Sequence, residues 1–454
     1  MRDLSSIIKA YDVRGVVPDQ WDEDVARAIG AAFAEFVAQE TGATAVVTAH
    51  DMRDSSVPLS RAFAEGVIGR GLDVVEAGLG STDMLYFAAG SLDLPGAMFT
   101  ASHNPAQYNG IKMCRAGAAP IGQDSGLATI REWAERDSYD GTPDRVGDVT
   151  SREIVQEYAA YLRALVDLTG IRPLKVVVDA GNGMGGYTVP VVLDGLPLEI
   201  VPLYFELDGS FPNHEANPLE PANLVDLQKA VREHDADIGL AFDGDADRVF
   251  VVDERGEPVS PSAITALVSV RELATGRGTT IIHNLITSQA VPEIVREHGG
   301  TPVRTRVGHS FIKAEMARTD AVFGGEHSAH YYFRDFWRAD TGMLAAMHVL
   351  AALGEQGAAL SELTAAYSRY AASGEINSTV ADARASTARV RETFAAQDGV
   401  TVDDLDGLTV HLSDGAWFNL RASNTEPLLR LNVEAPDEQR MAQVRDQVLE
   451  MVRS

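Results

Sequence analysis

Three aspartates at alternate positions, directly after an apolar run, form a candidate metal site. The segment is Asp243-Gly244-Asp245-Ala246-Asp247-Arg248, and it follows the strand-like stretch 238–242. Carboxylates spaced in this way can converge on one hard cation such as Mg²⁺, and the small residues between them leave the backbone room to curl around it. An EF-hand with Glu254 at its twelfth position is excluded, because Arg248 stands where the sharp turn requires glycine. A merely solvated acidic turn is the other alternative, but it would leave like charges together beside apolar strands.

A serine stands in a second polar segment that also follows an apolar run. The segment 100–105 comes after 97–99 and places Ser102 beside His103. One interpretation is turn chemistry, since short polar side chains bond the local backbone. The other is a serine that carries a phosphoryl group, which requires an exposed hydroxyl, a metal and nearby cations, of which Lys112 is a candidate. From these residues alone both interpretations stay open.

A third polar segment, 324–330, has chemistry suited to hydroxyl groups. Glu326, Ser328 and His330 lie at alternate positions, so their side chains share one face if the segment is extended. Such a row suits the hydroxyls of a sugar. A capped helix start or a buried histidine is the alternative, and the pair Gly308-His309 is by itself more typical of a structural turn.

The fourth candidate is an anion site between two strand-like runs. Arg421 precedes small hydroxyl and amide side chains, which are Ser423, Asn424 and Thr425. Such donors beside a guanidinium can hold a phosphate. An ordinary hairpin loop is the alternative, but the arginine two residues ahead of the polar cluster favours a phosphate site.

One glycine pattern is a poor candidate for nucleotide binding. The segment 181–186 matches G-x-G-x-x-G after a strand-like run, and this signal is weak when it stands alone. The acidic residue expected about 20 positions later is Glu199, which precedes the apolar pair Ile200-Val201 instead of ending a strand. The sequence therefore does not favour dinucleotide binding.

Short β-branched runs that end in polar turns position these segments. The runs 45–48, 175–178 and 279–282 are strand-like, and helical spacing follows, as at 60–70 and 289–298. Strand, loop and helix in this order are typical of an α/β domain, and the recurrence hints at three related domains.

The C-terminal part has a different pattern. Strand-like runs at 408–413, 417–420 and 428–433 come before a helical pattern at 437–451. Strands clustered ahead of a helix predict a separate α+β domain. Polar stretches near 137–151, 253–262 and 371–389 are the candidate boundaries.

Composition narrows the class of protein. With 454 residues, 45% of them hydrophobic, the chain is expected to fold into about three domains, give or take one. Its net charge of −28 and its lack of basic runs argue against nucleic acid or an anionic membrane as a partner. One cysteine, Cys114, excludes intrachain disulfides. Neither a secretory signal nor an apolar run long enough to span a membrane is recognisable, so we expect a soluble, cytoplasmic protein.

Taken together, the four segments describe an enzyme of phosphosugars with a phosphoserine, and they resemble those of the α-D-phosphohexomutase family, within it the phosphomannomutase/phosphoglucomutase group. The segments that carry the resemblance occur in the family's order across nearly the whole chain: 11–15, 100–105, 243–248, 324–330 and 421–427. The resemblance implies an α/β protein of four domains around a central cleft, three related α/β domains and a C-terminal α+β domain. We expect these domains at 1–150, 151–255, 256–370 and 371–454.

The resemblance also implies roles for individual residues. Ser102 would be the phosphoserine and, through its phosphate, a further ligand of the Mg²⁺ held by Asp243, Asp245 and Asp247. The reacting end would be lined by Tyr11, Arg14, Lys112 and Arg248. The sugar's 3- and 4-hydroxyls would bind Glu326 and Ser328, near Gly308. The phosphate that does not react would bind Arg421, Ser423, Asn424 and Thr425. The general acid and base would come from His330, His309, Lys112 and His103. One departure is Ala329, where many members have glycine, and it bears on which sugar is preferred.

The function implied is interconversion of hexose 6-phosphate and hexose 1-phosphate, for mannose and glucose, with a hexose 1,6-bisphosphate as intermediate and activator. Small-molecule sugar phosphates would be the partners. The alternatives are a phosphoglucosamine mutase, a metal-dependent phosphoserine-type phosphatase, and a sugar-phosphate-binding protein without activity. Release of inorganic phosphate as the main product would favour the phosphatase.

Overall fold

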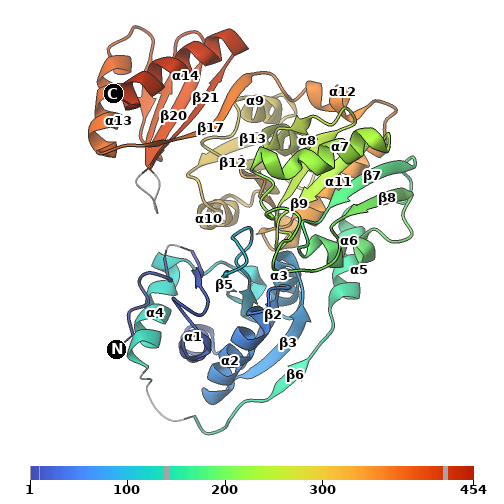
Figure 1. Cartoon of the computed structure of the whole chain (residues 1–454), viewed down its shortest axis with the longest axis vertical. Helices are drawn as coiled ribbons and strands as arrows, with labels where there is room; N and C mark the ends of the chain where they lie inside the picture. The colour runs from blue at the N-terminus through green and yellow to red at the C-terminus, as the bar shows by residue number, and fades with distance from the viewer. Residues whose placement is uncertain (1, 10, 138, 140–142, 423–427, 454) are drawn as a thin grey trace. The chain divides into compact units, whose positions relative to one another are not determined.

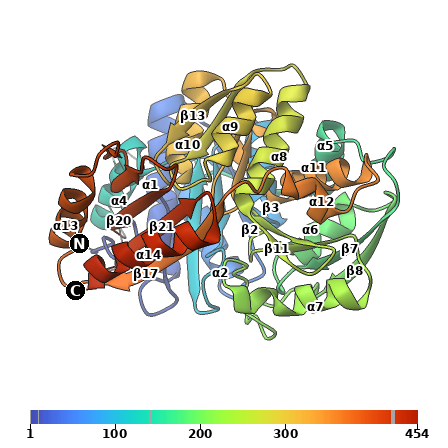
Figure 2. The ribbon, with the colours of Figure 1, turned by 90° about the horizontal axis from the view of Figure 1, so that it is seen from above.

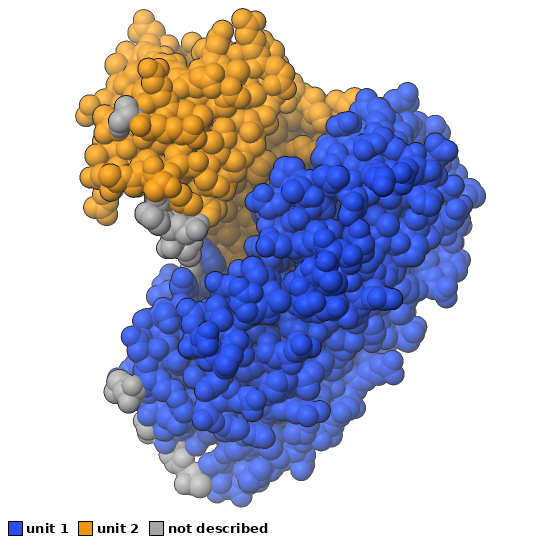
Figure 3. Space-filling view, viewed as in Figure 1, with its two compact units in different colours: residues 1–259, 328–363 blue, residues 260–327, 364–454 orange. Residues whose placement is uncertain are grey.

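Strands and helices alternate along most of the chain, as the β-branched runs and the helical spacing predict (Figure 1). The structure is a computed structural model and describes residues 2–9, 11–137, 139, 143–422 and 428–453. The chain divides into two units, residues 1–259 with 328–363 and residues 260–327 with 364–454 (Figure 3). No helix among the described residues is long and apolar enough to cross a membrane.

The first sheet is mixed and has six strands in the order β1-β5-β4-β2-β3-β6. Strand β2 is parallel to β3 and β4, whereas β5 is antiparallel to β4 and β1. Helices α1 and α2 pack closely because they meet at glycines: a Cβ on Gly30 would lie 2.1 Å from the Phe63 carbonyl oxygen. The elements are β1 Val13–Val16, α1 Glu23–Thr41, β2 Ala45–His50, α2 Ser56–Gly69, β3 Asp73–Leu79, α3 Thr82–Ser91, β4 Gly96–Phe99, β5 Tyr108–Cys114, α4 Leu127–Arg136 and β6 Val149–Ser151.

The second sheet has five strands in the order β11-β10-β9-β7-β8. Its inner strands β7 and β9 are parallel, and β9 continues into β10 as an antiparallel pair. All residues of β9 and β10 are buried, and apart from Asp253 at the end of β10 they are apolar or glycine, as expected for strands covered on both faces. The elements are α5 Val155–Leu165, β7 Leu174–Asp179, α6 Gly185–Val192, β8 Leu198–Leu203, α7 Val225–Glu233, β9 Ile238–Phe242, β10 Val249–Asp253 and β11 Pro258–Val259.

The third α/β region is divided between the two units. In the second unit, β12 is parallel to both β13 and β14. In the first unit, β15 and β16 form an antiparallel pair followed by the buried helix α11. The elements are α8 Pro261–Ala274, β12 Thr280–Asn284, α9 Ala290–Glu297, β13 Thr301–Thr305, α10 His309–Thr319, β14 Phe323–Gly325, β15 Tyr331–Phe333, β16 Ala339–Asp340, α11 Gly342–Gly354 and α12 Leu360–Ala365. Short 3₁₀ helices lie at Ala116–Ala118, Gln123–Ser125, Pro221–Leu224 and Arg334–Phe336.

The last sheet is antiparallel throughout, in the order β17-β21-β20-β19-β18, and it confirms the predicted α+β domain. Helices α13 and α14 cover one face of this sheet (Figures 1 and 2), and Phe394 of α13 and Val448 of α14 pack with Phe418 of β20. The polar stretch marked as a boundary contains a strand and a helix that the sequence did not reveal, since β17 is an edge strand with mostly exposed side chains. The elements are β17 Ala371–Thr379, α13 Ala383–Ala395, β18 Thr401–Asp403, β19 Leu408–His411, β20 Trp417–Ala422, β21 Leu428–Ala435 and α14 Glu438–Arg453.

Candidate active site

The three aspartates converge between two buried strands. The segment that joins β9 to β10 turns back on itself, with Ala246 in the left-handed region at a φ of 59°. Asp243, Asp245 and Asp247 are each at most 1% exposed. Each offers a carboxylate oxygen, and these oxygens all lie within 4.8 Å of one another. The structure therefore brings together the three side chains that the sequence singled out.

The hydrogen bonds of this cluster leave two buried oxygens available to a cation. Among the described residues, Oδ1 of Asp245 and Oδ1 of Asp247 have no hydrogen-bond partner. A buried carboxylate oxygen without a partner is costly, and a hard divalent cation with oxygen ligands would remove that cost. The donor set therefore fits Mg²⁺.

Ser102 lies beside this cluster, just after β4. Its Oγ donates to Oδ2 of Asp243 at 2.9 Å and lies 3.2 Å from Nδ1 of His103. Its φ of 51° is in the left-handed region, and its main-chain N–H donates to Oγ1 of Thr100 at 2.9 Å. Gly244 permits the close approach of the two loops, since a Cβ there would lie 2.4 Å from the Ser102 carbonyl oxygen.

Two cations, the half-buried Lys112 and the buried Arg248, offset the charge of the aspartates. Nζ of Lys112, on β5, donates to Oδ2 of Asp245 at 2.7 Å and to Oδ2 of Asp247 at 2.6 Å. Nε of Arg248 donates to Oδ2 of Asp243 at 2.9 Å. Fixed cations and carboxylates around a serine hydroxyl are the arrangement that a transferring phosphoryl group requires.

Burial and neighbouring charges set the protonation of these groups. Burial raises the pKa of Asp243 to about 7, although the Arg248 guanidinium opposes the shift. Burial would lower the pKa of Lys112, but the carboxylates of Asp245 and Asp247 hold it well above its ordinary value. Burial, with the charge of Arg248, lowers the pKa of His103 well below its usual range. His103 is therefore neutral at physiological pH, and its Nδ1 lies 2.6 Å from Nη2 of Arg248, which fits an acceptor there.

Arg14, on β1, reaches the loop that carries the serine. Its Nη1 donates to Oδ1 of Asn104 at 2.7 Å, and its Nη2 pairs with Asp12 at 2.5 Å. Tyr11 precedes β1 and is partly buried. The structure thus places Arg14 in contact with the serine loop.

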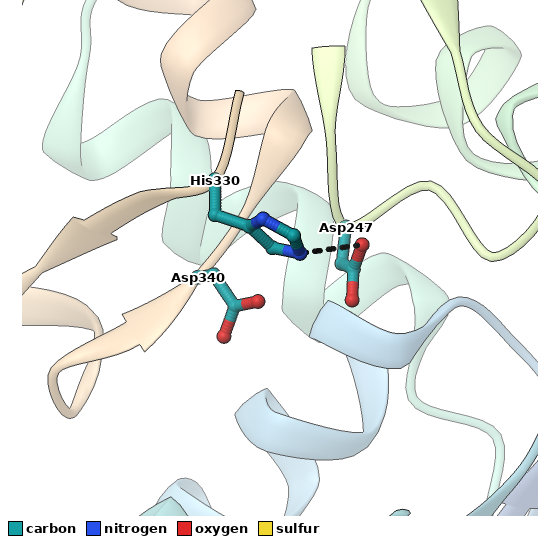
Figure 4. Close-up of side chains that lie close together, drawn as sticks. All are labelled: Asp247, His330 and Asp340. Atoms are coloured by element: carbon teal, nitrogen blue, oxygen red, sulfur yellow. Dashed lines mark ion pairs between the residues drawn. The ribbon is translucent and has the colours of Figure 1, made fainter. Parts of the chain in front are cut away.

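His330 faces two carboxylates in the first unit (Figure 4). Its Nε2 lies 3.9 Å from Oδ1 of Asp247, and Asp340 completes the cluster. Its Nδ1 lies 2.9 Å from Oγ of Ser328. The condition of an extended segment is not met, because Ala329 between these residues has a φ of 64°.

Glu326 lies in the second unit and is held by two donors. Nδ2 of Asn284 and the main-chain N–H of Gly308 donate to its Oε2, at 3.1 and 3.3 Å. Glu326 is 2% exposed and Asn284 is fully buried. His309 begins α10 and is partly buried. Asn284 was not among the predicted site residues, although a polar residue at the end of an apolar strand is a usable signal.

Arg421 is the last polar residue of the otherwise mostly apolar strand β20, also in the second unit. Its Nη2 lies 3.2 Å from Oε2 of Glu375, and its Nε has no hydrogen-bond partner in the described part of the chain. The predicted phosphate ligands Ser423, Asn424 and Thr425 lie outside the described residues.

Two buried residues at the start of α3 were not predicted, and one of them, Thr82, supports the metal loop. Oγ1 of Thr82 donates to Oδ2 of Asp245 at 2.6 Å, and its N–H donates to the Asp245 carbonyl oxygen at 3.0 Å. Asp83 is 1% exposed and accepts from three hydroxyls, those of Ser81, Tyr158 and Thr341. In the sequence these residues have the appearance of an ordinary helix cap.

The glycine-rich segment after β7 packs against the metal loop. The N–H of Met184 donates to the Gly244 carbonyl oxygen at 2.9 Å, and a Cβ on Gly183 would lie 2.6 Å from that same oxygen. Close backbone packing therefore accounts for these glycines without a nucleotide.

Models of known protein families match the chain in four consecutive segments. Family models described as phosphoglucomutase/phosphomannomutase match alpha/beta/alpha domain I at residues 5–140, domain II at 156–256, domain III at 260–370 and the C-terminal domain at 375–451.

Relatives align with nearly the full length of the chain. A protein named phosphohexose mutases from Xanthomonas campestris pv. campestris is 41% identical over 446 residues, 97% of each chain. A phosphomannomutase from Salmonella montevideo is 40% identical over 436 residues, 94% of each chain. The crystal structure of a phosphoglucomutase/phosphomannomutase family protein from Burkholderia thailandensis is 33% identical, covers 99% of this chain and 97% of its own, and superposes with a TM-score of 0.90.

Four domains of this fold, with a serine hydroxyl at a buried carboxylate cluster, define an enzyme of phosphoryl transfer. The chain belongs to the phosphoglucomutase/phosphomannomutase family and is an isomerase, a mutase of hexose phosphates.

Proposed function

We propose that this enzyme interconverts the 6-phosphate and the 1-phosphate of mannose and of glucose, through a phosphoserine at Ser102 and a hexose 1,6-bisphosphate. The observation that carries the proposal is the Ser102 hydroxyl, 2.9 Å from Asp243 in a cluster with Lys112 and Arg248. A nucleophile, a cation site and fixed positive charges are what phosphoryl transfer needs. Relatives named phosphomannomutase support mannose as one of the sugars.

The reaction consists of two balanced phosphoryl transfers. A hexose hydroxyl attacks the phosphorus of phospho-Ser102, and the new O–P bond forms as the Oγ–P bond breaks. The proton of the attacking hydroxyl passes to a base, and an acid returns a proton to the leaving Oγ. The bisphosphate then turns end for end, and Oγ of Ser102 takes the other phosphoryl group, which releases the isomeric monophosphate. A Mg²⁺ ion bound by the three aspartates would offset charge on the transferring group.

The chain's own residues supply the rest of the chemistry. Lys112 and Arg248 contribute fixed positive charge beside Ser102. The proton is exchanged by one of His330, His309, Lys112 and His103. The raised pKa of Lys112 and the lowered pKa of His103 support a cationic role for the first and an acceptor role for the second.

Substrate binding is assigned to two further groups of residues. The sugar hydroxyls are bound by Glu326 and Ser328, near Gly308. The phosphate that does not react is bound by Arg421, Ser423, Asn424 and Thr425, while Tyr11 and Arg14 line the reacting end. We place the enzyme in the cytoplasm, with Mg²⁺ as its metal and a hexose 1,6-bisphosphate as its activator.

The decisive test is Ser102→Ala. Without the nucleophile, turnover should fall by roughly a thousandfold or more, while binding of glucose 1-phosphate is retained. Intact-mass measurement after incubation with glucose 1,6-bisphosphate should find one added phosphoryl group on the natural protein and none on the variant. Full turnover by the variant would refute the phosphoserine.

A substrate assay resolves the sugar. The 1-phosphates of mannose, glucose and glucosamine are compared with and without a hexose 1,6-bisphosphate. Mannose and glucose should be preferred and should depend on the activator. Preference for glucosamine phosphate, or release of inorganic phosphate as the main product, would replace the proposal with one of its alternatives.

A further inference from the structure

Arg53, in the turn after β2, is a buried arginine with every donor in use. Its side chain is 1% exposed, and it lies at the back of the loop that carries Ser102. A guanidinium has five N–H donors in a fixed plane. Nε donates to Oδ2 of Asp51 at 3.2 Å, and the remaining four N–H groups are directed at main-chain carbonyl oxygens.

All four carbonyl oxygens belong to the serine loop or to the first residue of the strand that follows it. Nη2 donates to Ser102 at 2.8 Å and to Asn104 at 2.7 Å. Nη1 donates to Pro105 at 2.9 Å and to Tyr108 at 3.0 Å. One side chain therefore ties together the main chain from the candidate nucleophile to the start of β5.

The surroundings of Arg53 keep its side chain in one place. Oδ1 of Asp51 accepts from the Arg53 N–H at 3.0 Å and from Oγ of Ser56 at 2.6 Å. The ring of Phe211 lies 5.0 Å from the guanidinium carbon. Gly209 permits this contact, because a Cβ there would lie 2.7 Å from Cα of Arg53.

The serine loop needs such a clamp because its backbone is strained at Ser102. A φ of 51° is unfavourable for a residue with a Cβ and persists only where the surroundings enforce it. This same conformation directs Oγ to Asp243. Carbonyl oxygens that converge without a donor would also repel one another, so the loop depends on the guanidinium for its shape.

We propose that Arg53 is the positioning residue that fixes the serine loop so that Ser102 Oγ is presented to the metal cluster. The inference rests on the proposed function, since it assumes that Ser102 carries the phosphoryl group. Lysine cannot replace arginine here: its ammonium is a single point with three donors, and it cannot reach four carbonyl oxygens in a plane.

The chain offers a matched control in Arg163. This arginine also donates to three main-chain carbonyl oxygens, those of Val191, Val192 and Asp194, but at the end of α6. Arg163→Lys therefore removes the same kind of contact away from the serine loop. A merely structural role of Arg53 would make the two variants behave alike.

The experiment compares Arg53→Lys and Arg163→Lys in the full chain, at a temperature well below the unfolding transition of each. The rate of Ser102 phosphorylation by glucose 1,6-bisphosphate is followed by intact mass. Arg53→Lys should be slower by roughly ten- to a hundredfold, because a displaced nucleophile loses its alignment. Its Kd for glucose 1-phosphate should stay within about twofold, and Arg163→Lys should phosphorylate at the natural rate.

Amide hydrogen exchange measures the stability of the serine loop independently of enzymatic activity. Peptides that cover 100–110 should exchange about tenfold faster in Arg53→Lys and unchanged in Arg163→Lys. Natural phosphorylation and natural exchange in folded Arg53→Lys would overturn the proposal. If the natural protein itself takes no phosphoryl group, the proposed function fails, and unchanged exchange in Arg53→Lys would then overturn the loop clamp separately.

Discussion

Three buried carboxylates, the half-buried Lys112 and the buried Arg248 share the surroundings of Ser102. Nζ of Lys112 donates to Oδ2 of both Asp245 and Asp247. The Oδ1 atoms of these two aspartates have no hydrogen-bond partner among the described residues. With all three carboxylates ionised, which for Asp243 requires a pH above its raised pKa of about 7, the cluster has one negative charge in excess, and uncompensated charge is costly in a buried position. A divalent cation would turn this excess positive, which suits a doubly charged phosphoryl group.

Selection among sugars is expected to depend on Glu326. Its carboxylate is 2% exposed and is oriented by Asn284 and Gly308. Mannose and glucose differ only at C2, so both present the same 3- and 4-hydroxyls. Galactose inverts C4 and would leave a contact to the carboxylate unmade, at a cost of about 1.5–3 kcal/mol. We expect kcat/KM for galactose 1-phosphate to be at least about tenfold lower than for glucose 1-phosphate.

The control for this prediction is Glu326→Gln. An amide keeps the shape but weakens the bond to the hydroxyl, so the discrimination against galactose should shrink together with overall activity. Equal kcat/KM for the galactose and glucose phosphates in the natural protein would contradict the role of Glu326.

At the scale of elements, the sequence predicted the inner strands and the loops that leave them. The run 238–242 forms β9 with the same bounds, and the acidic loop after it is the cluster that the structure shows. The prediction succeeds because a strand buried on both faces is a continuous apolar run and the polar residues that follow it are conspicuous. The three aspartates of that loop also lie within five consecutive positions, so one short segment contains the whole pattern.

The supporting contacts could not be predicted, because they join residues far apart in the chain. Thr82 bonds Asp245, and Arg53 bonds the carbonyl oxygen of Ser102. In the sequence Thr82 only follows the helix cap Ser81, and Arg53 is one arginine in a turn. Left-handed backbone at Ser102 and Ala329 has no composition signal either, since neither residue is glycine.

The junction of α3, α5 and α11 is expected to respond to pH through Asp83. Burial raises the pKa of this carboxyl to about 6 from 3.8, although hydroxyls of Ser81, Tyr158 and Thr341 donate to it. Between pH 4 and 6 the folded protein keeps a proton that the unfolded chain has lost. The contribution of Asp83 to the free energy of unfolding therefore falls as pH rises through this window, by up to about 3 kcal/mol.

The measurement is thermal unfolding between pH 4 and 7, for the natural protein and for Asp83→Asn, which cannot titrate. The Tm of the variant should increase relative to that of the natural protein as pH rises. The altered hydrogen bonds can add a constant difference between the two curves, but they do not change this trend. Parallel curves over the whole range would show that Asp83 ionises normally.

Ala329 tests the backbone of the turn before β15. Its φ of 64° costs an L-residue about 1–2 kcal/mol, and its side chain is fully buried. Ala329→Gly removes this strain but loses a buried methyl and adds freedom to the unfolded chain, so stability should change by less than about 1 kcal/mol. Ala329→Val adds a β-branched side chain to the same backbone and should cost more than about 2 kcal/mol. Denaturant unfolding distinguishes them, and a tolerated valine would mean that the turn is not left-handed.

At the scale of the whole molecule, the charge of the chain and the charge of its substrate have the same sign. Acidic residues number 66 and basic residues 38. Beyond about 8 Å this repulsion is screened at physiological salt, so binding of a sugar phosphate depends on local cations. Lys112, Arg248 and Arg14 supply them around Ser102 in the first unit, and Arg421 supplies one in the second unit.

The proposed reaction requires Arg421 to bind either phosphate of the bisphosphate. The bisphosphate must be bound in two opposite orientations while the residues of the enzyme keep their roles, so Arg421 meets first one phosphate and then the other. Removal of its guanidinium deletes a charge-assisted contact worth about 1.5–3 kcal/mol, which is roughly ten- to a hundredfold in affinity. Arg421→Ala should therefore lower the affinities for glucose 1-phosphate and glucose 6-phosphate by similar factors. Ser102 should still accept a phosphoryl group from the bisphosphate, because its surroundings are unchanged.

Calorimetric titration of both monophosphates tests this requirement directly. Arg440→Ala is the control, since Arg440 pairs with Asp414 at 2.6 Å at the start of α14 and should leave both affinities unchanged. Glu375 accepts from Arg421 in this structure and competes with a phosphate for it. Glu375→Gln should therefore raise the affinity for both monophosphates. If Arg421→Ala weakens one monophosphate strongly and the other hardly at all, a single arginine does not serve both orientations, and the two phosphates must be bound by different residues.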